Sequence, residues 1–337
     1  MDTTPPLTPP VVVVVIPCYK VRAHVLGVLA AIGSEVDRIL CVDDACPEGA
    51  GDFIQQHCKD PRVRVLFNSV NRGVGGAVIA GYRAALEIGA TVVVKVDGDG
   101  QMDPRLIARF IAPILDDTAD YTKGNRFYNL ADVQRMPGFR VLGNAGLSFL
   151  TKLSSGYWHV FDPTNGYTAI HGAVLRELPL ERLAERYFFE SDILHRLYLA
   201  RAVVVDVPMR SVYGEEVSNL RISRVLLPFL WSNLRNTARR LLYCYFLRDF
   251  TAASLEMLVG VPLVAFGMVF GGVAWLASIN SGVPATAGTV MTAAFPIMTG
   301  VQLLLAAIGH DISAVPRVPM HPILESRRSH RLSHGEV

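Results

Sequence analysis

The sequence predicts an α/β domain with a mostly parallel β-sheet, followed by amphipathic helices and two membrane-spanning helices. Strand-like apolar segments alternate with helix-like segments up to about Asp120, which is the pattern of successive βαβ units with right-handed crossovers. The last third of the chain contains two long stretches without a charged residue. A chain of 337 residues has room for both parts.

The composition limits the class of protein. At 51% hydrophobic and 18% charged residues, the chain is more apolar than a typical soluble domain. Its net charge of +2 is too small to indicate nucleic-acid binding. The five cysteines are odd in number and lack CxxC spacing, so we expect reduced thiols instead of disulfides or a zinc site. Residues 1–10 lack the features of a signal peptide and are expected to be a disordered lead-in.

Five segments have the character of strands, and helix-like segments lie between them. Val11–Ile16 is a continuous β-branched run, as expected for a strand buried on both faces. The other strands are expected at Arg38–Asp44, Val63–Phe67, Thr91–Asp97 and Val203–Met209. Helices are expected at Val21–Ile32, Gly51–His57, Val74–Leu86, Phe139–Leu153 and Tyr187–Ala202. Residues 123–138 are expected to form a loop, and Val160–Gly172 a turn-rich hairpin.

Residues 219–252 mix arginine with large apolar side chains. Arg235 and Arg239 are four apart and share one helix face. An ordinary amphipathic surface helix is one interpretation. The position just before an apolar stretch favours an interfacial helix, whose arginines, Arg240 among them, are expected to attract anionic lipid.

Residues 253–310 contain two uncharged stretches, Met257–Ile279 and about Thr289–Gly309, each close to the ~20 residues that cross a bilayer. They predict a transmembrane hairpin, with a buried soluble hairpin as the alternative. Because arginines flank both ends, the positive-inside rule places the catalytic part (residues 11–218) and the basic tail (residues 311–337) in the cytoplasm. Gly267, Gly271 and Gly272 permit close helix packing but identify no partner, so a homo-oligomer is left open.

Two aspartates end the predicted strand Thr91–Asp97. Asp97 and Asp99 are two residues apart, so in an extended chain their carboxylates point the same way and need a shared cation or proton. Such oxygen ligands favour Mg²⁺ or Mn²⁺, with phosphates and water completing the shell. An Asp-x-Asp motif alone also fits an ordinary acidic turn. Its place after an apolar strand, where parallel sheets bind ligands, favours the metal site.

Other strand ends carry further candidates. Asp43 and Asp44 are candidates to bind a ribose or base edge, or to cap the next helix in a turn. The stretch Asn71–Leu86 resembles a dinucleotide fingerprint but has Val78 where the last glycine is needed. Its glycine-rich helix start at Gly73 can still cradle a diphosphate, and a simple loop with a helix cap is the alternative.

Seven segments occur in the order seen in family 2 glycosyltransferases. They are VVIPCYK, VDDACPEGAGD, NRGVGGAVIAGYRAAL, VDGDGQMDP, KGNRF, DPTNGYTAI and YGEEVSNL. Over roughly residues 10–310 the chain resembles the polyprenyl-phosphate branch of this family, which includes dolichyl-phosphate mannose synthases and bacterial undecaprenyl-phosphate glycosyltransferases. The resemblance implies a GT-A fold, with inverting, metal-dependent transfer of a sugar from a nucleotide sugar to a polyprenyl phosphate. UDP is preferred over GDP as the donor nucleotide on the same ground.

The resemblance also assigns the donor side of the site. The residues expected to bind the nucleotide are Pro17, Tyr19, Asp44 and Arg72, joined by Asp43, Gly73 and Asp97. The residues that match the family's metal and diphosphate site are Asp97, Asp99 and Gln101.

On the acceptor side, Arg126 and Arg140 fall where the family holds the acceptor phosphate, which a guanidinium matches bidentately. Asn144 lies one helical turn beyond Arg140 and is expected to help. Asp162 opens the family's D-x-T-x-G stretch near the sugar. Glu190 and Asp192 are candidates to bind sugar hydroxyls, or charges that complement a helix N-terminus. The residues expected to carry the reaction are Asp97, Asp99, Asp162, Arg126 and Arg140.

The chain departs from the family at two motifs. Lys20 and Val21 stand where Asn-Glu is usual, and Gly214–Asn219 lacks a lysine often found there, which leaves the donor sugar open. One rival function is a glycosyltransferase for a lipid or glycan hydroxyl, which would need a carboxylate base such as Asp162 or Asp192. Another is a membrane-anchored, non-catalytic nucleotide-sugar-binding scaffold, which the retained acids and arginines disfavour.

Overall fold

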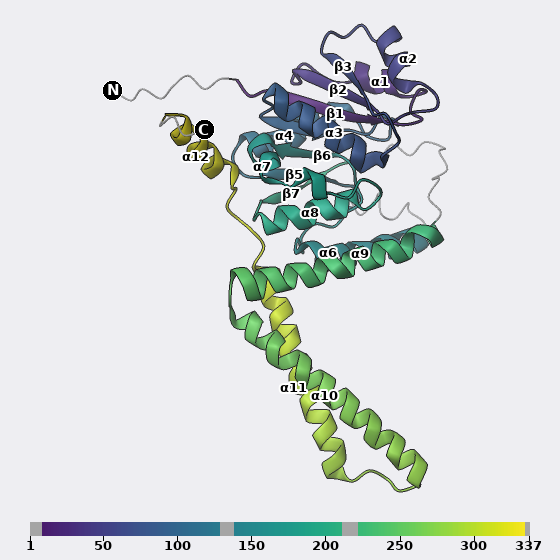
Figure 1. The fold of residues 1–337 in the computed structure, drawn as a ribbon, viewed down its shortest axis with the longest axis vertical. Helices are drawn as coiled ribbons and strands as arrows, with labels where there is room; N and C mark the ends of the chain where they lie inside the picture. The colour runs from purple at the N-terminus through teal and green to yellow at the C-terminus, as the bar shows by residue number, and fades with distance from the viewer. Residues whose placement is uncertain (1–8, 129–137, 211–221, 334–337) are drawn as a thin grey trace. The chain divides into compact units, whose positions relative to one another are not determined.

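The computed structural model describes residues 9–128, 138–210 and 222–333 (Figure 1). The chain divides into two compact units, one formed by Met1–Thr237 with Pro316–Val337 and the other by Ala238–Val315. The chain therefore leaves the first unit, forms the second, and returns to the first.

The first unit contains a seven-stranded sheet with the order β3-β2-β1-β4-β6-β5-β7. The strands are β1 (Val12–Cys18), β2 (Arg38–Asp43), β3 (Val63–Phe67), β4 (Val92–Lys95), β5 (Tyr121–Asn125), β6 (Thr168–His171) and β7 (Val204–Pro208). Among these strands, only β6 runs antiparallel to its neighbours, β4 and β5. The expected mostly parallel sheet is confirmed.

Two expectations about local structure were wrong. A loop was expected from Lys123 onward, but residues 123–125 complete strand β5, and all five residues of this strand are buried. The stretch Val160–Gly172 is not a hairpin. It contributes the single strand β6, which pairs with β4 on one side and β5 on the other. The first error arose because polar residues such as those of β5 usually indicate an exposed segment.

Helices cover both faces of the sheet. They are α1 (Val25–Ala30), α2 (Ala50–His57), α3 (Gly73–Ile88), α4 (Ile107–Leu115), α6 (Gly138–Ser155), α7 (Gly172–Glu177) and α8 (Phe189–Leu199). Side chains alternate along a strand, so Val14 and Ile16 of β1 enter the core that α1, α2 and α4 also supply. Val15 faces α3, where a Cβ at Gly81 would lie 2.3 Å from its Cγ1. A glycine is therefore required there for the helix to approach the sheet.

Helix α9 (Ile222–Leu242) is docked onto the first unit by two buried asparagines. Ser154 of α6 donates its hydroxyl to Oδ1 of Asn233 at 2.6 Å, and Nδ2 of Asn236 donates to Asp192 of α8 at 3.1 Å. The same helix exposes Leu227, Trp231 and Leu234, each by more than 60%. Their spacing of four and three residues places them on one apolar face, as an interfacial helix requires.

Helix α12 (His321–Ser333), in the C-terminal tail, packs on the same unit against α7. The buried carboxylate of Asp120 accepts hydrogen bonds from the backbone amides of Val203, Met320 and His321, and the His321 ring lies 2.7 Å away. Burial opposes the charge of His321, but its contacts with Asp120 and Asp117 outweigh this and raise its pKa. His171 stacks on His321, and burial lowers the pKa of His171 to about 4.

We predict that Asp120→Asn loosens α12, because an amide cannot accept all of these hydrogen bonds and its own NH₂ faces donors. The free energy of unfolding should fall by roughly 1–3 kcal/mol. Hydrogen exchange should accelerate at the amides of Met320 and His321. Asp116→Asn, at an exposed position four residues earlier, is the matched control and should change neither measurement. Unchanged exchange in the Asp120 variant would contradict the assigned role.

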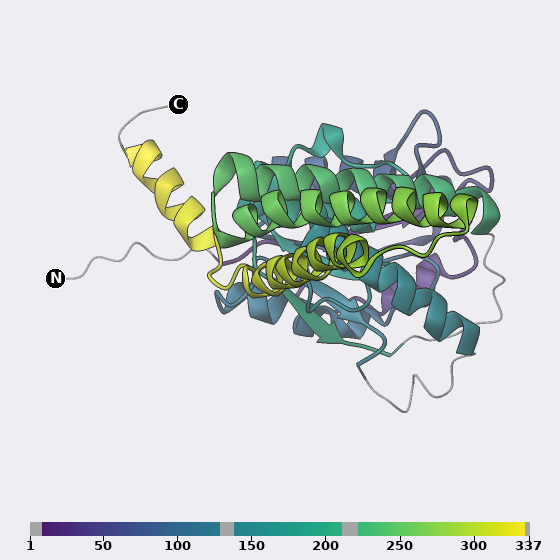
Figure 2. The same cartoon turned by 90° about the horizontal axis from the view of Figure 1, so that it is seen from below.

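The second unit is a helical hairpin of α10 (Ala252–Ser281) and α11 (Ala287–Ser313), which lie side by side in Figures 1 and 2. Both are long and apolar enough to cross a membrane, with mean hydropathies of 2.1 and 1.8 over their most apolar windows. Only 11% of each window is buried, unlike a core helix of a soluble protein. A Cβ at Gly267 would lie 2.7 Å from the carbonyl oxygen of Ala293, so this glycine serves packing within the hairpin.

Arg240 has a different role from the one expected. Its guanidinium is buried in the second unit, where Nη1 and Nη2 donate to Asp311 at 2.6 and 2.9 Å. The hydroxyl of Tyr245 donates to the same carboxylate at 2.5 Å. The expectation that Arg240 faces lipid was therefore wrong. Asp311 is an acid at the end of an apolar helix, and burying it requires a paired cation.

Candidate active site

The carboxyl ends of β1, β2 and β4 bring the predicted donor-site segments to one edge of the sheet. Pro17 lies in β1 and pairs with Val42 of β2, and Tyr19 follows the strand with its ring partly exposed. Asp44 follows β2, and Asp97 follows β4. Because β1 is parallel to both neighbours, these residues end at the same edge, where open α/β sheets bind ligands.

The two adjacent acids at the end of β2, Asp43 in the strand and Asp44 directly after it, each accept hydrogen bonds from backbone amides. Asp43 accepts hydrogen bonds from the amides of Cys46 and Gly51, at 2.7 and 2.6 Å, which fixes the start of α2. Asp44 accepts from the amides of Arg72 and Gly73, at 3.0 and 2.7 Å, and so pins the N-terminus of α3 beside β2. The contacts of Asp43 match the turn interpretation. Those of Asp44 bring three predicted nucleotide-binding residues together.

The Asp-x-Asp loop carries oxygen donors of the kind that hard cations bind. Asp99 accepts from the amide of Gln101 at 3.0 Å, in a tight turn that places Gly100 at φ +79°. Within the described ranges, no group of three or more His, Cys, Asp or Glu side chains is arranged so that it could hold a metal ion by itself. Two carboxylates with an amide fit Mg²⁺ or Mn²⁺ only if phosphate and water oxygens complete the shell, which is how Mg²⁺ commonly binds beside nucleotides.

Lys95, which the sequence reasoning did not single out, lies beneath this loop. The side chain is 1% exposed, and Nζ lies 2.8 Å from Oδ1 of Asp97, 3.1 Å from the carbonyl oxygen of Gly166 and 3.4 Å from Glu190. Burial opposes its charge, but Asp97 and Glu190 outweigh this and raise the pKa of Lys95. Lys95 is therefore a permanent cation that ties three segments of the site together.

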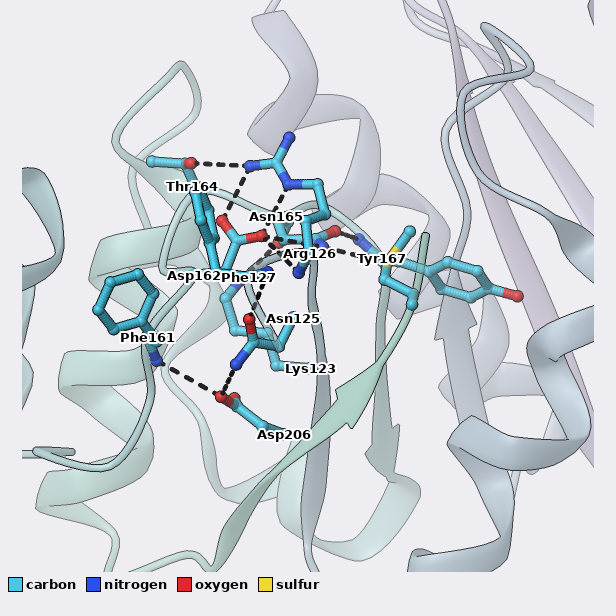
Figure 3. A network of polar contacts seen from close by, with 11 residues as sticks. Lys123, Asn125, Arg126, Phe127, Phe161, Asp162, Thr164, Asn165, Tyr167 and Asp206 are labelled. Atoms are coloured by element: carbon cyan, nitrogen blue, oxygen red, sulfur yellow. Dashed lines mark hydrogen bonds and ion pairs between the residues drawn. The ribbon is translucent and has the colours of Figure 1, made fainter. Parts of the chain in front are cut away.

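Asp162 and Arg126 form the centre of the second part of the site, shown in Figure 3. Nε and Nη2 of Arg126 donate to the two carboxylate oxygens of Asp162 at 2.7 and 2.8 Å. Asp162 is buried, whereas the Arg126 side chain is 28% exposed. Asn165 also donates to Asp162, at 3.3 Å. The predicted sugar-site acid and the predicted acceptor arginine thus form one bidentate pair, with the guanidinium on the outer side.

A second buried lysine underlies this pair. Nζ of Lys123 donates to the carbonyl oxygen of Asn165, and burial lowers the pKa of Lys123 to about 8. Asn125 donates to Asp206 at 2.7 Å, and burial raises the pKa of Asp206. Neither Lys123 nor Asp206 was expected at the site. A lysine inside an otherwise apolar strand, as in VVVKV, could have indicated a special role for Lys95. The polar segment TKGN offers no such contrast for Lys123.

The remaining predicted residues separate into three cases. Glu190 reaches the site through Lys95. Asp192 is buried and accepts from the amide of Ala184, from Arg196 and from Asn236, so its carboxylate joins helices. Arg140 and Asn144 lie in α6, and their side chains fall outside the described residues.

The two parts of the site meet at Gly166, whose backbone lies against the side chains of Asp97 and Lys95. A Cβ built there would lie 2.6 Å from Oδ2 of Asp97 and 2.4 Å from Nζ of Lys95. The turn of residues 162–166 therefore rests directly against Asp97, and its other end carries Asp162, which is paired with Arg126. The Asp-x-Asp loop and the Arg126–Asp162 pair are thus held at adjacent places on one sheet edge.

This arrangement is that of sugar transferases of the GT-A type, which use nucleotide-sugar donors. Solved structures with a similar fold include glucosyl-3-phosphoglycerate synthase from Mycobacterium tuberculosis, with a TM-score of 0.53 and 17% identity over 69% of this chain and 78% of that one. At this identity the likeness establishes the fold, and it confirms the expected GT-A class.

The chain belongs to glycosyl transferase family 2, whose model matches residues 13–178. The UDP-N-acetylglucosamine--dolichyl-phosphate N-acetylglucosaminyltransferase of Methanococcus voltae is 30% identical over 229 residues, which are 64% of this chain and 90% of that protein. The undecaprenyl-phosphate mannosyltransferase of Micrococcus luteus is 32% identical over 209 residues, 60% of this chain and 84% of the relative. The protein is a glycosyltransferase.

We predict that Gly166→Ala strongly lowers sugar transfer, because the added methyl group must displace Asp97, Lys95 or the turn. A shift near 1 Å at a reacting group costs up to about 10²-fold in rate. Initial rates of transfer, measured beside thermal melting, check this. Gly27→Ala in α1 is the matched control, since its Cβ would meet no atom within 4 Å. Wild-type rates in the Gly166 variant would show that the close approach is not needed.

Proposed function

We propose that the protein transfers a sugar, with inversion, from a UDP-sugar to a polyprenyl phosphate at the cytoplasmic face of a membrane. The observation that carries the proposal is the contact at Gly166, which holds the Asp97 loop next to the Asp162–Arg126 pair. A donor diphosphate and an acceptor phosphate need two such neighbouring sites. The relatives named for dolichyl-phosphate and undecaprenyl-phosphate acceptors support the acceptor class.

On the donor side, Asp97, Asp99 and Gln101 are the residues that would hold Mg²⁺ or Mn²⁺. The Mycobacterium tuberculosis synthase was solved with Mn²⁺ and UDP, which supports the same donor class here. When bound, the cation supplies charge compensation for the departing nucleoside diphosphate. Asp44 holds the N-terminus of α3, with the amides of Arg72 and Gly73, at the sheet edge where a nucleotide would bind.

On the acceptor side, Arg126 orients the phosphate while Asp162 holds the guanidinium in place. A phosphate monoester has its second pKa at about 6, so the attacking oxygen is already largely ionised at neutral pH. A strong general base is then unnecessary. Direct attack at the anomeric carbon, opposite the leaving diphosphate, inverts that centre.

The contacts of the acids disfavour the rival that uses a hydroxyl acceptor. That reaction needs an available carboxylate base, and Asp162 and Asp192 were the candidates. Asp162 is 1% exposed and paired with Arg126, and Asp192 is occupied by three donors from its surroundings. Neither carboxylate has the accessibility that a base for an incoming hydroxyl requires.

Transfer of labelled sugar to a polyprenyl phosphate by the purified protein tests the proposal. With Mn²⁺ or Mg²⁺ and a panel of UDP-sugars, we expect a lipid-linked monosaccharide of inverted configuration by NMR. Chelation should abolish it, and Asp99→Asn should reduce the rate by about 10²-fold or more, because one carboxylate ligand is lost. Asp116→Asn, at an exposed position directly after α4, is the control. No lipid-linked product with any nucleotide sugar would refute the proposal.

The exposed apolar face of α9 supports attachment of this helix to a lipid surface. Leu227, Trp231 and Leu234 face outward, and Arg235 and Arg239 are on the same helix. A cationic amphipathic helix binds anionic headgroups through its basic residues and the acyl boundary through its apolar ones. Together with the apolar hairpin and the flanking arginines, it supports a cytoplasmic orientation for the first unit.

We predict that the double substitution of Arg235 and Arg239 by Gln weakens turnover of a long-chain acceptor in anionic vesicles. Each cation near the surface contributes about 1 kcal/mol of attraction, so loss of both should reduce the rate by up to about 30-fold. Binding of soluble UDP should not change. Substitution of Arg38 and Arg64, exposed on β2 and β3, removes the same charge and is the control. Equal loss of nucleotide binding and turnover would contradict the interfacial role.

A further inference from the structure

Two buried lysines lie in register across three strands of the sheet. Lys95 of β4 and Lys123 of β5 each pair with Thr168 of β6, which runs between them. Directly paired residues project from the same face of a sheet, so the two lysine side chains run parallel beneath the same turn. Their exposed fractions are 1% and 0%, which is exceptional for lysine.

The two ammonium groups hold consecutive peptide carbonyls. Nζ of Lys95 donates to the carbonyl of Gly166 at 3.1 Å, and Nζ of Lys123 donates to the carbonyl of Asn165. In the close-up of Figure 3, the Arg126 guanidinium and Thr164 lie at the top of the network, and Lys123 lies below Asn165. The turn that leads into β6 is therefore fixed from below at two adjacent points.

Stability alone does not account for these lysines. Moving an ammonium group from water into a protein interior costs several kcal/mol, and apolar residues of similar volume are often at least as stabilising. What the lysines add is directional: an ammonium holds a carbonyl oxygen at hydrogen-bond distance, which an apolar side chain cannot do. Their burial is thus best explained by the position that they impose on the turn.

That position matters at both ends of the turn. At one end Gly166 touches Asp97, the acid of the donor diphosphate site. At the other end Asp162 holds Arg126 of the acceptor phosphate site through two hydrogen bonds. A displacement of the turn would therefore change the distance between Asp97 and Arg126.

We propose that Lys95 and Lys123 are positioning residues that set the separation between the donor diphosphate at Asp97 and the acceptor phosphate at Arg126. This inference rests on the proposed function. In transfer, an acceptor phosphate oxygen bonds to the anomeric carbon as the bond from that carbon to the nucleoside diphosphate breaks, and the electron pair leaves with the diphosphate. In the competing hydrolysis, a water oxygen attacks instead and releases a proton to solvent. Correct separation favours transfer, because water needs no positioning by Arg126.

The test compares Lys123→Met with Lys123→Gln. Methionine keeps the approximate length and volume but donates no hydrogen bond, whereas the glutamine amide still donates. Each variant is incubated with UDP-sugar, Mn²⁺ and polyprenyl phosphate, and the ratio of lipid-linked sugar to free sugar is measured together with UDP affinity. We expect the ratio to fall roughly 10-fold to 100-fold in the methionine variant. The glutamine variant should recover part of it, and UDP affinity should stay within about two-fold of wild type in both.

Lys95→Met provides an independent second variant. It should lower the same ratio, and it should also weaken UDP binding, because Asp97 loses its buried partner. Lys59→Met, at an exposed position in the loop after α2, is the matched control and should leave ratio and affinity unchanged. Circular dichroism and thermal melting identify any variant that does not fold, in which case the glutamine variant at that position takes its place and a lowered ratio is still expected.

The outcomes separate the two proposals. A wild-type protein that makes no lipid-linked sugar overturns the proposed function. A wild-type protein that transfers sugar, beside folded Lys123 and Lys95 variants with an unchanged ratio, overturns only the positioning role. A parallel loss of transfer and hydrolysis, with the ratio constant, also overturns it, because a general structural defect gives that result.

Discussion

Burial of charge at the carboxyl edge of the sheet is the constraint on which the site depends. Lys95 and Lys123 are buried; Asp97 and Glu190 lie close to Lys95, and Glu190 and Asp162 act electrostatically on Lys123. None of these groups tolerates burial unless a partner of opposite charge or a peptide dipole lies within hydrogen-bond distance. The position of each buried charged group therefore limits where its partner can lie. The positions of the Asp97 loop, the turn at Gly166 and Arg126 follow from one set of mutually satisfied charges.

The fold was largely predictable because its central strands have a simple physical signature. A strand covered on both faces must be apolar throughout, and Val12–Ile16 and Val92–Val94 are. The same reasoning failed for β5, because it is buried with threonine, lysine and asparagine side chains that are satisfied by other segments. Thr122, for example, donates to the carbonyl of Phe110. Such partners come from distant parts of the chain, and no local pattern contains them.

The site was predictable at the level of segments and less so at the level of contacts. The acid pair at a strand end predicts a loop of ligand-binding type, and the motif order identifies the family. The sequence does not indicate that both carboxylate oxygens of Asp43 accept hydrogen bonds from backbone amides at the start of α2. It also does not indicate that Asp192 lies between packed helices. Nor does the sequence indicate that Arg240 is paired with Asp311. Each of these outcomes depends on which donors tertiary packing brings near a carboxylate.

The return of the chain to the first unit restricts how the protein can be inserted in a bilayer. The segment up to Thr237 and helix α12 belong to one folded body, joined through Asp120 and His321, so both ends of the intervening hairpin must emerge in the same compartment. The number of crossings between them is then even by parity, whichever compartment it is. Because His321 is synthesised after both apolar helices, Asp120 cannot acquire its last partners until both have been translated.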